Sequence, residues 1–127
     1  MNQVVRVLLV DNDLRFLESA SSIFINQGVE VLIACDPEQV HYYLNGSLVF
    51  DAVIADLSSP FFGSPKYCQS LVTKYPLVAV SASLEQKFLD HYSICDCVLD
   101  KNTIHDLLMS ATLKAMQRHH LGLQMVG

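Results

Sequence analysis

Residues 7–13 read VLLVDND, four apolar residues followed directly by three polar ones. Four later segments repeat the apolar pattern, and helical spacing fills the stretches between them. Strands whose apolar residues are continuous rather than alternating are buried on both faces, as in parallel sheets covered by helices. Polar residues that follow such a strand lie at the carboxyl edge of the sheet, where open parallel sheets bind their ligands. This stretch therefore predicts both the fold class and the location of the chemistry.

The alternation of strand and helix signals continues along the chain. Strands are predicted at residues 4–10, 29–34, 51–55, 77–80 and 94–99, and helices at 14–27, 37–45, 64–75, 84–91 and from 103 past 116. Strands separated by helices favour parallel pairing through right-handed crossovers. The prediction is one α/β domain over residues 1–127, a doubly wound five-stranded parallel sheet with five helices.

The composition excludes several classes of protein. Hydrophobic residues make up 51% of the chain and charged residues 17%, which suits a buried core rather than disorder. The net charge of -5, without a basic block, argues against direct binding of nucleic acid or an anionic membrane. The longest apolar run has five residues, far fewer than the roughly 20 of a membrane span. With no signal peptide visible, a cytoplasmic protein is expected.

The four cysteines contain no C-x-x-C pair and no ligand-spaced histidine. They are therefore expected to be free thiols that pack as small hydrophobic residues. Cys95 and Cys97 alternate on the fifth predicted strand, so both side chains are expected on the same face of the sheet.

Polar side chains follow four of the five predicted strands. Asp11 and Asn12 come after the first strand, Asp56 after the third, Ser81 after the fourth and Lys101 after the fifth. Carboxylates brought together repel each other unless a cation lies between them, and Mg²⁺ suits such a site because it takes one or two carboxylates and commonly binds phosphate. Lysine and serine add a charge and a hydroxyl that can hold phosphate oxygens. A carboxylate between a metal and a lysine is a plausible nucleophile, so the residues indicate phosphoryl chemistry on an aspartate.

Each of these positions also has a purely structural interpretation. Asp13 can be explained as the N-cap of the first helix and nothing more, Ser81 as a turn hydroxyl and Lys101 as a solvated charge. Taken singly, the structural interpretation is favoured. Their joint occurrence at separate strand ends favours a functional site.

Four segments, at residues 8–13, 50–57, 78–82 and 98–101, resemble the receiver domain of response regulators, the phospho-accepting part of two-component signalling systems. The resemblance covers residues 4 to about 118 and implies a flavodoxin-like sheet of order 2-1-3-4-5. It implies a phosphorylated signalling module rather than an enzyme. The site that it implies comprises Asp56 as phospho-acceptor, Ser81 as switch hydroxyl, Lys101 as the lysine that contacts the phosphoryl group, and Asp11, Asn12, Asp56 and the Ser58 carbonyl around Mg²⁺.

The resemblance also implies partners. The phosphoryl donor would be a sensor histidine kinase or a phosphotransfer protein, and the output an effector protein or an attached domain. The domain itself is not expected to bind nucleic acid or a membrane. The oligomeric state stays open, a homodimer included.

Three residues depart from the pattern of the family. Asn12 stands where a second aspartate is usual, Asn102 where a proline usually follows the lysine, and Val98 where the family has its switch aromatic. The amide at position 12 should weaken Mg²⁺ binding, and the missing proline should make the turn more pliable. Asn12 and Val98 keep a second hypothesis open, a pseudo-receiver that binds partners without phosphorylation. A flavin-binding domain of the same topology is a third, which carboxylates at the phosphate end disfavour.

Overall fold

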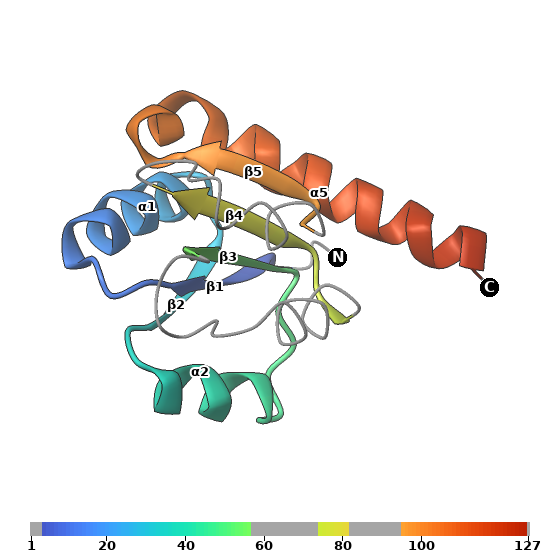
Figure 1. The fold of residues 1–127 in the computed structure, drawn as a ribbon, viewed down its shortest axis with the longest axis horizontal. Helices are drawn as coiled ribbons and strands as arrows, with labels where there is room; N and C mark the ends of the chain where they lie inside the picture. The colour runs from blue at the N-terminus through green and yellow to red at the C-terminus, as the bar shows by residue number, and fades with distance from the viewer. Residues whose placement is uncertain (1–3, 57–73, 82–94, 127) are drawn as a thin grey trace.

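A computed structural model describes the chain at residues 4–56, 74–81 and 95–126 (Figure 1). The predicted helices at 64–75 and 84–91 lie largely or wholly outside these residues. The described elements, in chain order, are β1 (Arg6–Val10), α1 (Leu14–Asn26), β2 (Glu30–Ala34), α2 (Pro37–Leu44), β3 (Ala52–Asp56), β4 (Leu77–Ser81), β5 (Cys97–Asp100), the 3-10 turn η2 (Lys101–Thr103) and α5 (Ile104–Val126).

The five strands form one parallel sheet of order β2-β1-β3-β4-β5, which confirms the predicted fold class. The register places Val10 beside Ala34 on one side and beside Ala55 on the other. On the far half of the sheet, Ser81 lies beside Asp100. The strands therefore end close to level, and the residues that follow them gather at one edge.

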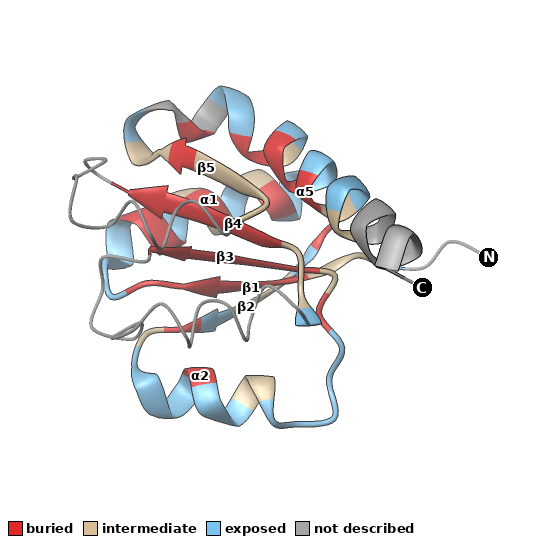
Figure 2. Cartoon of the chain, turned by 45° about the vertical axis from the view of Figure 1, so that its right-hand side comes forward, coloured by how far each residue is buried: buried red, intermediate tan, exposed pale blue. Residues whose placement is uncertain are grey.

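Helices cover both faces of the sheet (Figures 1 and 2). One hydrophobic cluster joins the sheet to α1 and α5 through buried side chains such as Phe24 and Leu108. The cluster on the other face includes Val40 of α2 and Phe50 before β3. Every residue of β3 and β4 is buried, as continuous apolar strands between two helical layers require.

The cysteine prediction is half wrong. Cys35, Cys95 and Cys97 are free thiols, as expected. However, Cys97 packs against the α1 and α5 cluster, whereas Cys95 packs against the α2 cluster on the opposite face. The physical reason is that β5 begins only at Cys97, so Cys95 lies in the bend before the strand and its direction does not follow strand alternation.

The last helix, α5, has 23 residues and extends well past the sheet (Figure 1). Its first turns dock through Ile104, Leu108 and Ala115, which are buried. Further along, the Arg118 guanidinium donates a hydrogen bond of 2.8 Å to the carbonyl of Asp96. Neither this nor any other helix in the described part of the chain combines the length and apolar character that crossing a membrane requires.

Replacing Gly28 with alanine is expected to destabilise the protein by about 1 kcal/mol. Gly28 follows α1 with φ at +77°, a left-handed backbone conformation that side chains disfavour, while an added Cβ would meet no atom within 4 Å. The loss should therefore come from the backbone alone, and Gly28→Asn should lose less because asparagine tolerates this conformation better. Urea unfolding followed by circular dichroism measures both. Equal midpoints for the alanine variant and the parent chain would contradict the expectation.

Candidate functional site

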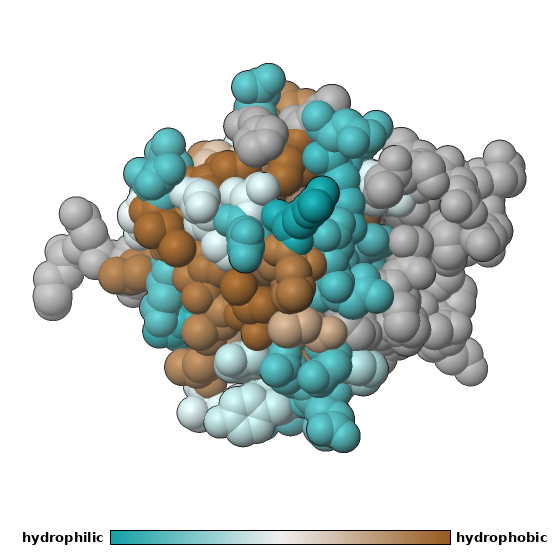
Figure 3. Space-filling view, turned by 90° about the vertical axis from the view of Figure 1, so that its left-hand side faces the viewer, coloured by the Kyte–Doolittle hydropathy of each residue, from teal (hydrophilic) through white to brown (hydrophobic). Residues whose placement is uncertain are grey.

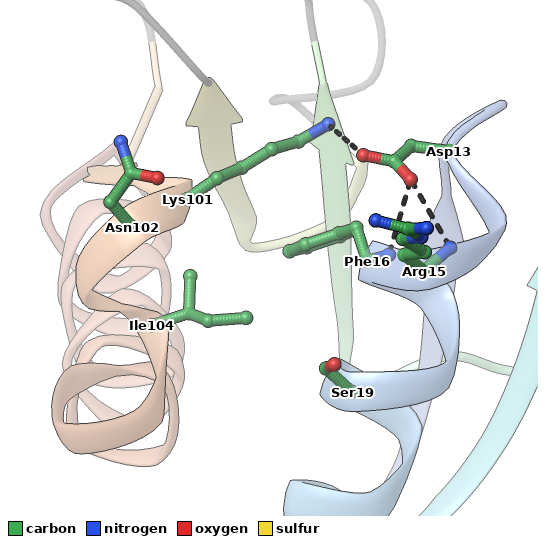
Figure 4. A pocket seen from close by; sticks show the side chains of 7 residues that line it. All are labelled: Asp13, Arg15, Phe16, Ser19, Lys101, Asn102 and Ile104. Carbon is green, nitrogen blue, oxygen red and sulfur yellow. Dashed lines mark hydrogen bonds and ion pairs between the residues drawn. The ribbon is translucent and has the colours of Figure 1, made fainter.

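The ammonium of Lys101 lies between two carboxylates at the carboxyl edge of the sheet. Its Nζ is 2.7 Å from Oδ2 of Asp11 and 3.0 Å from Oδ2 of Asp56. A third carboxylate, Asp13, approaches the same nitrogen at 3.8 Å through its own Oδ2. Residues from the ends of β1, β3 and β5 thus meet at one point, as the order of the strands predicts. Figure 4 shows Lys101 reaching from the start of α5 across to Asp13 beside α1.

Burial makes it costly to keep the side chains of this cluster charged. The Asp11 side chain is fully buried, and the side chains of Asp56 and Lys101 are about one-tenth exposed. Burial raises the pKa of Asp11, although the hydrogen bond from Lys101 acts in the opposite direction. For Lys101, burial disfavours the charged form, but its hydrogen bonds with Asp11 and Asp56 outweigh burial and raise the pKa above its usual value. Lys101 is therefore a firmly charged ammonium at neutral pH.

The first turn of α1 is linked to the same cluster. Oδ1 of Asp11 accepts a hydrogen bond of 2.9 Å from the Asp13 backbone N–H. Asp13 in turn caps α1, since its Oδ1 accepts from the N–H groups of Arg15 and Phe16 at 3.1 and 3.3 Å. The predicted capping role of Asp13 is thus confirmed, but capping is not its only contact. Its other oxygen is the one that faces Lys101, so the residue both caps the helix and contributes charge to the site.

The remaining expected site residues are placed as follows. Ser81 ends β4 and is almost fully buried, at the same edge as the carboxylates. Asn12 directly follows the buried Asp11 and is exposed to solvent. Ser58, expected to offer a carbonyl to the metal, lies outside the described residues. The geometry therefore brings Asp11, Asp56 and Lys101 together and places Ser81 and Asn12 on the same edge of the sheet.

Two of the departures from the family pattern have visible structural consequences. The backbone N–H of Asn102 donates a hydrogen bond of 2.9 Å to Oδ1 of Asp100, which caps the η2 turn. Proline has no N–H, so a proline at this position would lose that bond. Val98 is a partly buried hydrophobic residue that packs against the α2 cluster. It therefore belongs to the core of the sheet rather than to a mobile aromatic position.

A hollow of about 250 Å³ opens beside the ammonium, between α1 and the start of α5 (Figure 4). The aliphatic stem of Lys101 forms part of its wall, and the Lys101 nitrogen stands 4.8 Å from the centroid of the Phe16 ring. This aromatic contact favours a cation. Sequence reasoning missed Phe16, because it looked only at residues after strands. The available signal was an aromatic residue in the first turn after the Asp13 cap. The residues that line this hollow are Asp13, Arg15, Phe16, Ser19, Lys101, Asn102 and Ile104.

Figure 3 looks at the edge of the sheet toward which the strands point. Hydrophobic side chains occupy much of the middle of this face, and hydrophilic side chains surround them. The side chains of Asp11, Asp56 and Lys101 are buried or nearly so, and interactions between buried charges are stronger than in water.

Within residues 4–56, 74–81 and 95–126, no group of three or more His, Cys, Asp or Glu side chains is arranged to hold a metal ion. The chemistry of the donors nevertheless fits Mg²⁺, which takes one or two carboxylates and keeps several waters. Asp11 and Asp56 both face one cation and would supply those carboxylates. The Asn12 side chain offers an amide oxygen with no charge, so the site has one negative charge fewer than a three-carboxylate site.

Solved structures with very similar backbones are receiver domains. One is the signal receiver domain of an HD domain-containing protein from Pseudomonas fluorescens Pf-5, with a TM-score of 0.80, 18% identity, and 98% of this chain and 95% of that chain covered. Another is a CheY-like response regulator receiver domain protein from Methanospirillum hungatei JF-1, with a TM-score of 0.78, 17% identity, and 94% and 99% covered. The chain has the receiver-domain fold.

A third receiver-fold structure is the N-terminal domain of a response regulator/sensory box/GGDEF three-domain protein from Carboxydothermus hydrogenoformans. It has a TM-score of 0.76 and 16% identity, and the match covers 93% of this chain and 98% of that chain. No protein-family model and no curated protein sequence matches the chain. At such low identities the similarity establishes the fold and not the function.

Proposed function

We propose that this chain is a phospho-accepting receiver module, in which Asp56 takes a phosphoryl group from a phosphohistidine of a partner protein. The observation that carries the proposal is the single ammonium of Lys101 held between Asp56 and Asp11 at 3.0 and 2.7 Å. A carboxylate beside a fixed cation can approach the negatively charged phosphoryl group, because the cation neutralises oxygens that would otherwise repel it. The chain is then the acceptor in the transfer and not an enzyme that turns over a substrate.

The proposed step balances as follows. An Asp56 carboxylate oxygen attacks phosphorus and forms a P–O bond, while the P–N bond to the partner's imidazole breaks. The imidazole nitrogen keeps the electron pair of that bond and takes up a proton from solvent. Lys101 moves its hydrogen bond from the carboxylate to a phosphoryl oxygen, and the Ser81 hydroxyl donates to another. The product is an aspartyl phosphate with additional negative charge at the end of β3.

Asp11, Asp56 and the Asn12 amide would hold Mg²⁺ in this proposal, with the Ser58 carbonyl as the further ligand implied by the resemblance. When bound, the ion would supply positive charge that offsets the charge of the transferring oxygens. The fully buried Asp11 would provide a carboxylate ligand for the ion. The backbone N–H of Asp13 holds this carboxylate in place with a hydrogen bond of 2.9 Å.

The experiment is incubation of the full chain with phosphoramidate and Mg²⁺, followed by intact-mass measurement. One phosphoryl group should add to the chain, and Asp56→Asn should abolish the gain completely because its amide is not a nucleophile toward phosphorus. Asp106→Asn is the matched control, because Asp106 is an exposed carboxylate on α5 and its loss should leave the gain unchanged. A gain that persists in Asp56→Asn, or none in the parent chain at any Mg²⁺ concentration, would rule the proposal out.

A second candidate function is a pseudo-receiver that binds partners without phosphorylation. The observations that favour it are the uncharged amide of Asn12 and the position of Val98, which packs against the core. The two functions are separated by a Mg²⁺ titration followed by chemical shifts of the Asp11 to Asp13 backbone amides. Saturation in the millimolar range or below supports the receiver, whereas shifts that never saturate support the pseudo-receiver.

The proposed partners follow from the reaction. The donor would be a histidine kinase or a phosphotransfer protein, which presents the phosphorylated imidazole to the carboxyl edge of the sheet. Among the structural neighbours, one receiver belongs to an HD domain-containing protein and one to a GGDEF protein. By analogy, we propose that phosphorylation changes a protein-interaction surface read by an effector or an attached domain.

A further inference from the structure

The face formed by α2 and the loop after it, residues 36–48, is distinct from the phosphoryl site. Val40 is buried, and Tyr43 and Leu44 pack partly buried against the sheet, so they hold the helix in place. Tyr42 lies at the surface and is 72% exposed, the largest exposure among the large hydrophobic side chains described. A ring so exposed contributes little to the core, so its position calls for an explanation in terms of the surface.

Two hollows share the two tyrosines of α2. The larger, of about 430 Å³, lies toward the start of the helix and is lined by Asp36, Glu38, Gln39, Tyr42 and Tyr43. The smaller, of about 230 Å³, lies at the end of the helix and is lined by Tyr42, Tyr43, Gly46, Ser47 and Leu48. The α2 face therefore offers two sites for side chains, with the tyrosines between them.

The tyrosines are held by other aromatic rings. The rings of Tyr42 and Tyr43 meet edge to face with centroids 5.4 Å apart. Tyr43 contacts Phe50 in the same way at 6.1 Å, and Phe50 is almost fully buried. The pair is thus supported from the core, which reduces the conformational entropy lost when a ligand binds to it.

The charged side chains that line the two hollows are both acidic, Asp36 and Glu38. Residues 16–65 contain no lysine or arginine, but they contain six carboxylates: Glu18, Glu30, Asp36, Glu38, Asp51 and Asp56. Arg6 touches the loop after α2 through the Val49 carbonyl at 3.3 Å, but its guanidinium is paired with Glu30 at 3.0 Å. Asp36 and Glu38 are exposed at the mouth of the larger hollow, so this hollow favours a cation.

The smaller hollow also favours a cation, for a different reason. It lies at the carboxyl end of α2, where backbone carbonyls carry partial negative charge. The chain passes close to these carbonyls, because a Cβ added at Gly46 would lie 3.1 Å from the carbonyl oxygen of Tyr42. Both hollows thus combine an aromatic wall with negative charge. This environment suits a guanidinium better than any other side chain.

We infer that the α2 face binds an arginine-bearing segment of a partner protein. One guanidinium lies against the tyrosines and pairs with Asp36 or Glu38, and a second enters the hollow that ends at Leu48. Arginine is favoured over lysine because its planar group stacks on a ring while pairing with a carboxylate. Nucleic acid is excluded by the sign of the charge, and a second copy of this chain, with a net charge of -5, would be repelled.

The test uses the ¹⁵N-labelled chain and a capped peptide, Gly-Arg-Gly-Gly-Arg-Gly, as the probe. Backbone amide shifts should change at residues 36–48, saturate, and weaken steeply with salt, since the attraction is between charges. The same peptide with lysine in place of arginine should bind at least threefold more weakly, and the glutamate version should not bind. Shifts spread evenly over the surface, or equal binding of the lysine and arginine peptides, would overturn the inference.

Matched variants localise the effect. Glu38→Lys should weaken binding of the arginine peptide at least fivefold. Glu18→Lys makes an equal change of charge at an exposed position of α1 and should change binding less than twofold. Tyr42→Ala should also weaken binding at least fivefold, and Leu113→Ala, at an exposed apolar position on α5, should not. All four changes are on the surface, so loss of folding does not confuse the result.

Equal losses in Glu38→Lys and Glu18→Lys would reduce the interaction to net charge and refute a specific site. Because Asp56 is not involved, the outcome is independent of phosphoryl transfer.

Discussion

Replacing Lys101 with methionine is expected to lower the free energy of unfolding by about 3 kcal/mol at pH 7, as removal of one partner from a buried ion pair does. Methionine keeps the apolar stem beside Phe16 but removes the ammonium that Asp11 and Asp56 share at 2.7 and 3.0 Å. The loss comes from two carboxylates left close together, one of them fully buried. Urea unfolding followed by circular dichroism measures it. Lys114→Met, at an exposed position on α5, is the control and should change stability by less than about 0.5 kcal/mol.

The pH dependence of this deficit has a definite sign at each end. The pKa of Lys101 is raised by its hydrogen bonds with Asp11 and Asp56, so its stabilisation is complete below the pKa of an unfolded lysine. It is lost as pH rises through the higher folded-state pKa, and the two chains should converge in strong alkali. The pKa of Asp11 is raised by burial, and without the ammonium it should rise further. Acidification should then protonate this carboxyl in Lys101→Met at a higher pH than in the parent chain and so reduce the deficit.

A double variant tests the cause. In Asp11→Asn/Lys101→Met the fully buried carboxylate and its repulsion with Asp56 are both removed, so much of the lost stability should return. Asp11→Asn alone should change stability by less than about 1 kcal/mol, because Lys101 keeps Asp56 as its partner at 3.0 Å. If the double variant is as unstable as Lys101→Met, the ammonium acts through packing and not through charge.

Replacing Phe24 with alanine is expected to cost about 4 kcal/mol, the range for large-to-small changes in a packed core. Phe24 is fully buried where α1 meets the sheet, in the same cluster as the α5 residue Leu108. Its neighbour Ile25 is 61% exposed on the same helix, so Ile25→Ala should cost less than about 0.5 kcal/mol. Urea unfolding of the pair measures the difference. Comparable losses for both would mean that helix propensity and not core packing determines the stability of α1.

The topology could be predicted from the sequence because each strand carries its own evidence. The continuous apolar runs of β1, β3 and β4 are buried at nearly every position, and parallel strands bring their carboxyl ends to one edge. Asp11, Asp56 and Lys101 could be found for the same reason. The direction of Cys95 could not, because it depends on where β5 begins, and no residue between 94 and 97 marks that point.

Other parts of the site depend on distances in space rather than on order along the chain. One oxygen of Asp13 caps α1, and the other faces Lys101. This arrangement depends on how α1 and η2 are placed relative to each other, which no local pattern determines. The tyrosine hollows are of the same kind, since they require the end of α2 to lie against the loop that contains Leu48. Local propensity predicts the helix but not its neighbours.

The position of α5 has a mechanical consequence. Lys101 opens the η2 turn, α5 begins three residues later, and the helix runs without interruption to Val126. At about 1.5 Å of rise per residue, a 23-residue helix is about 35 Å long. Since α5 is packed on the sheet as far as Ala115 and bonded at Arg118 to the Asp96 carbonyl, a rotation must move the helix as one rod, and about 5° would displace its far end by about 3 Å. An adjustment at Lys101 that tilted this rod would therefore be amplified at the far end of α5.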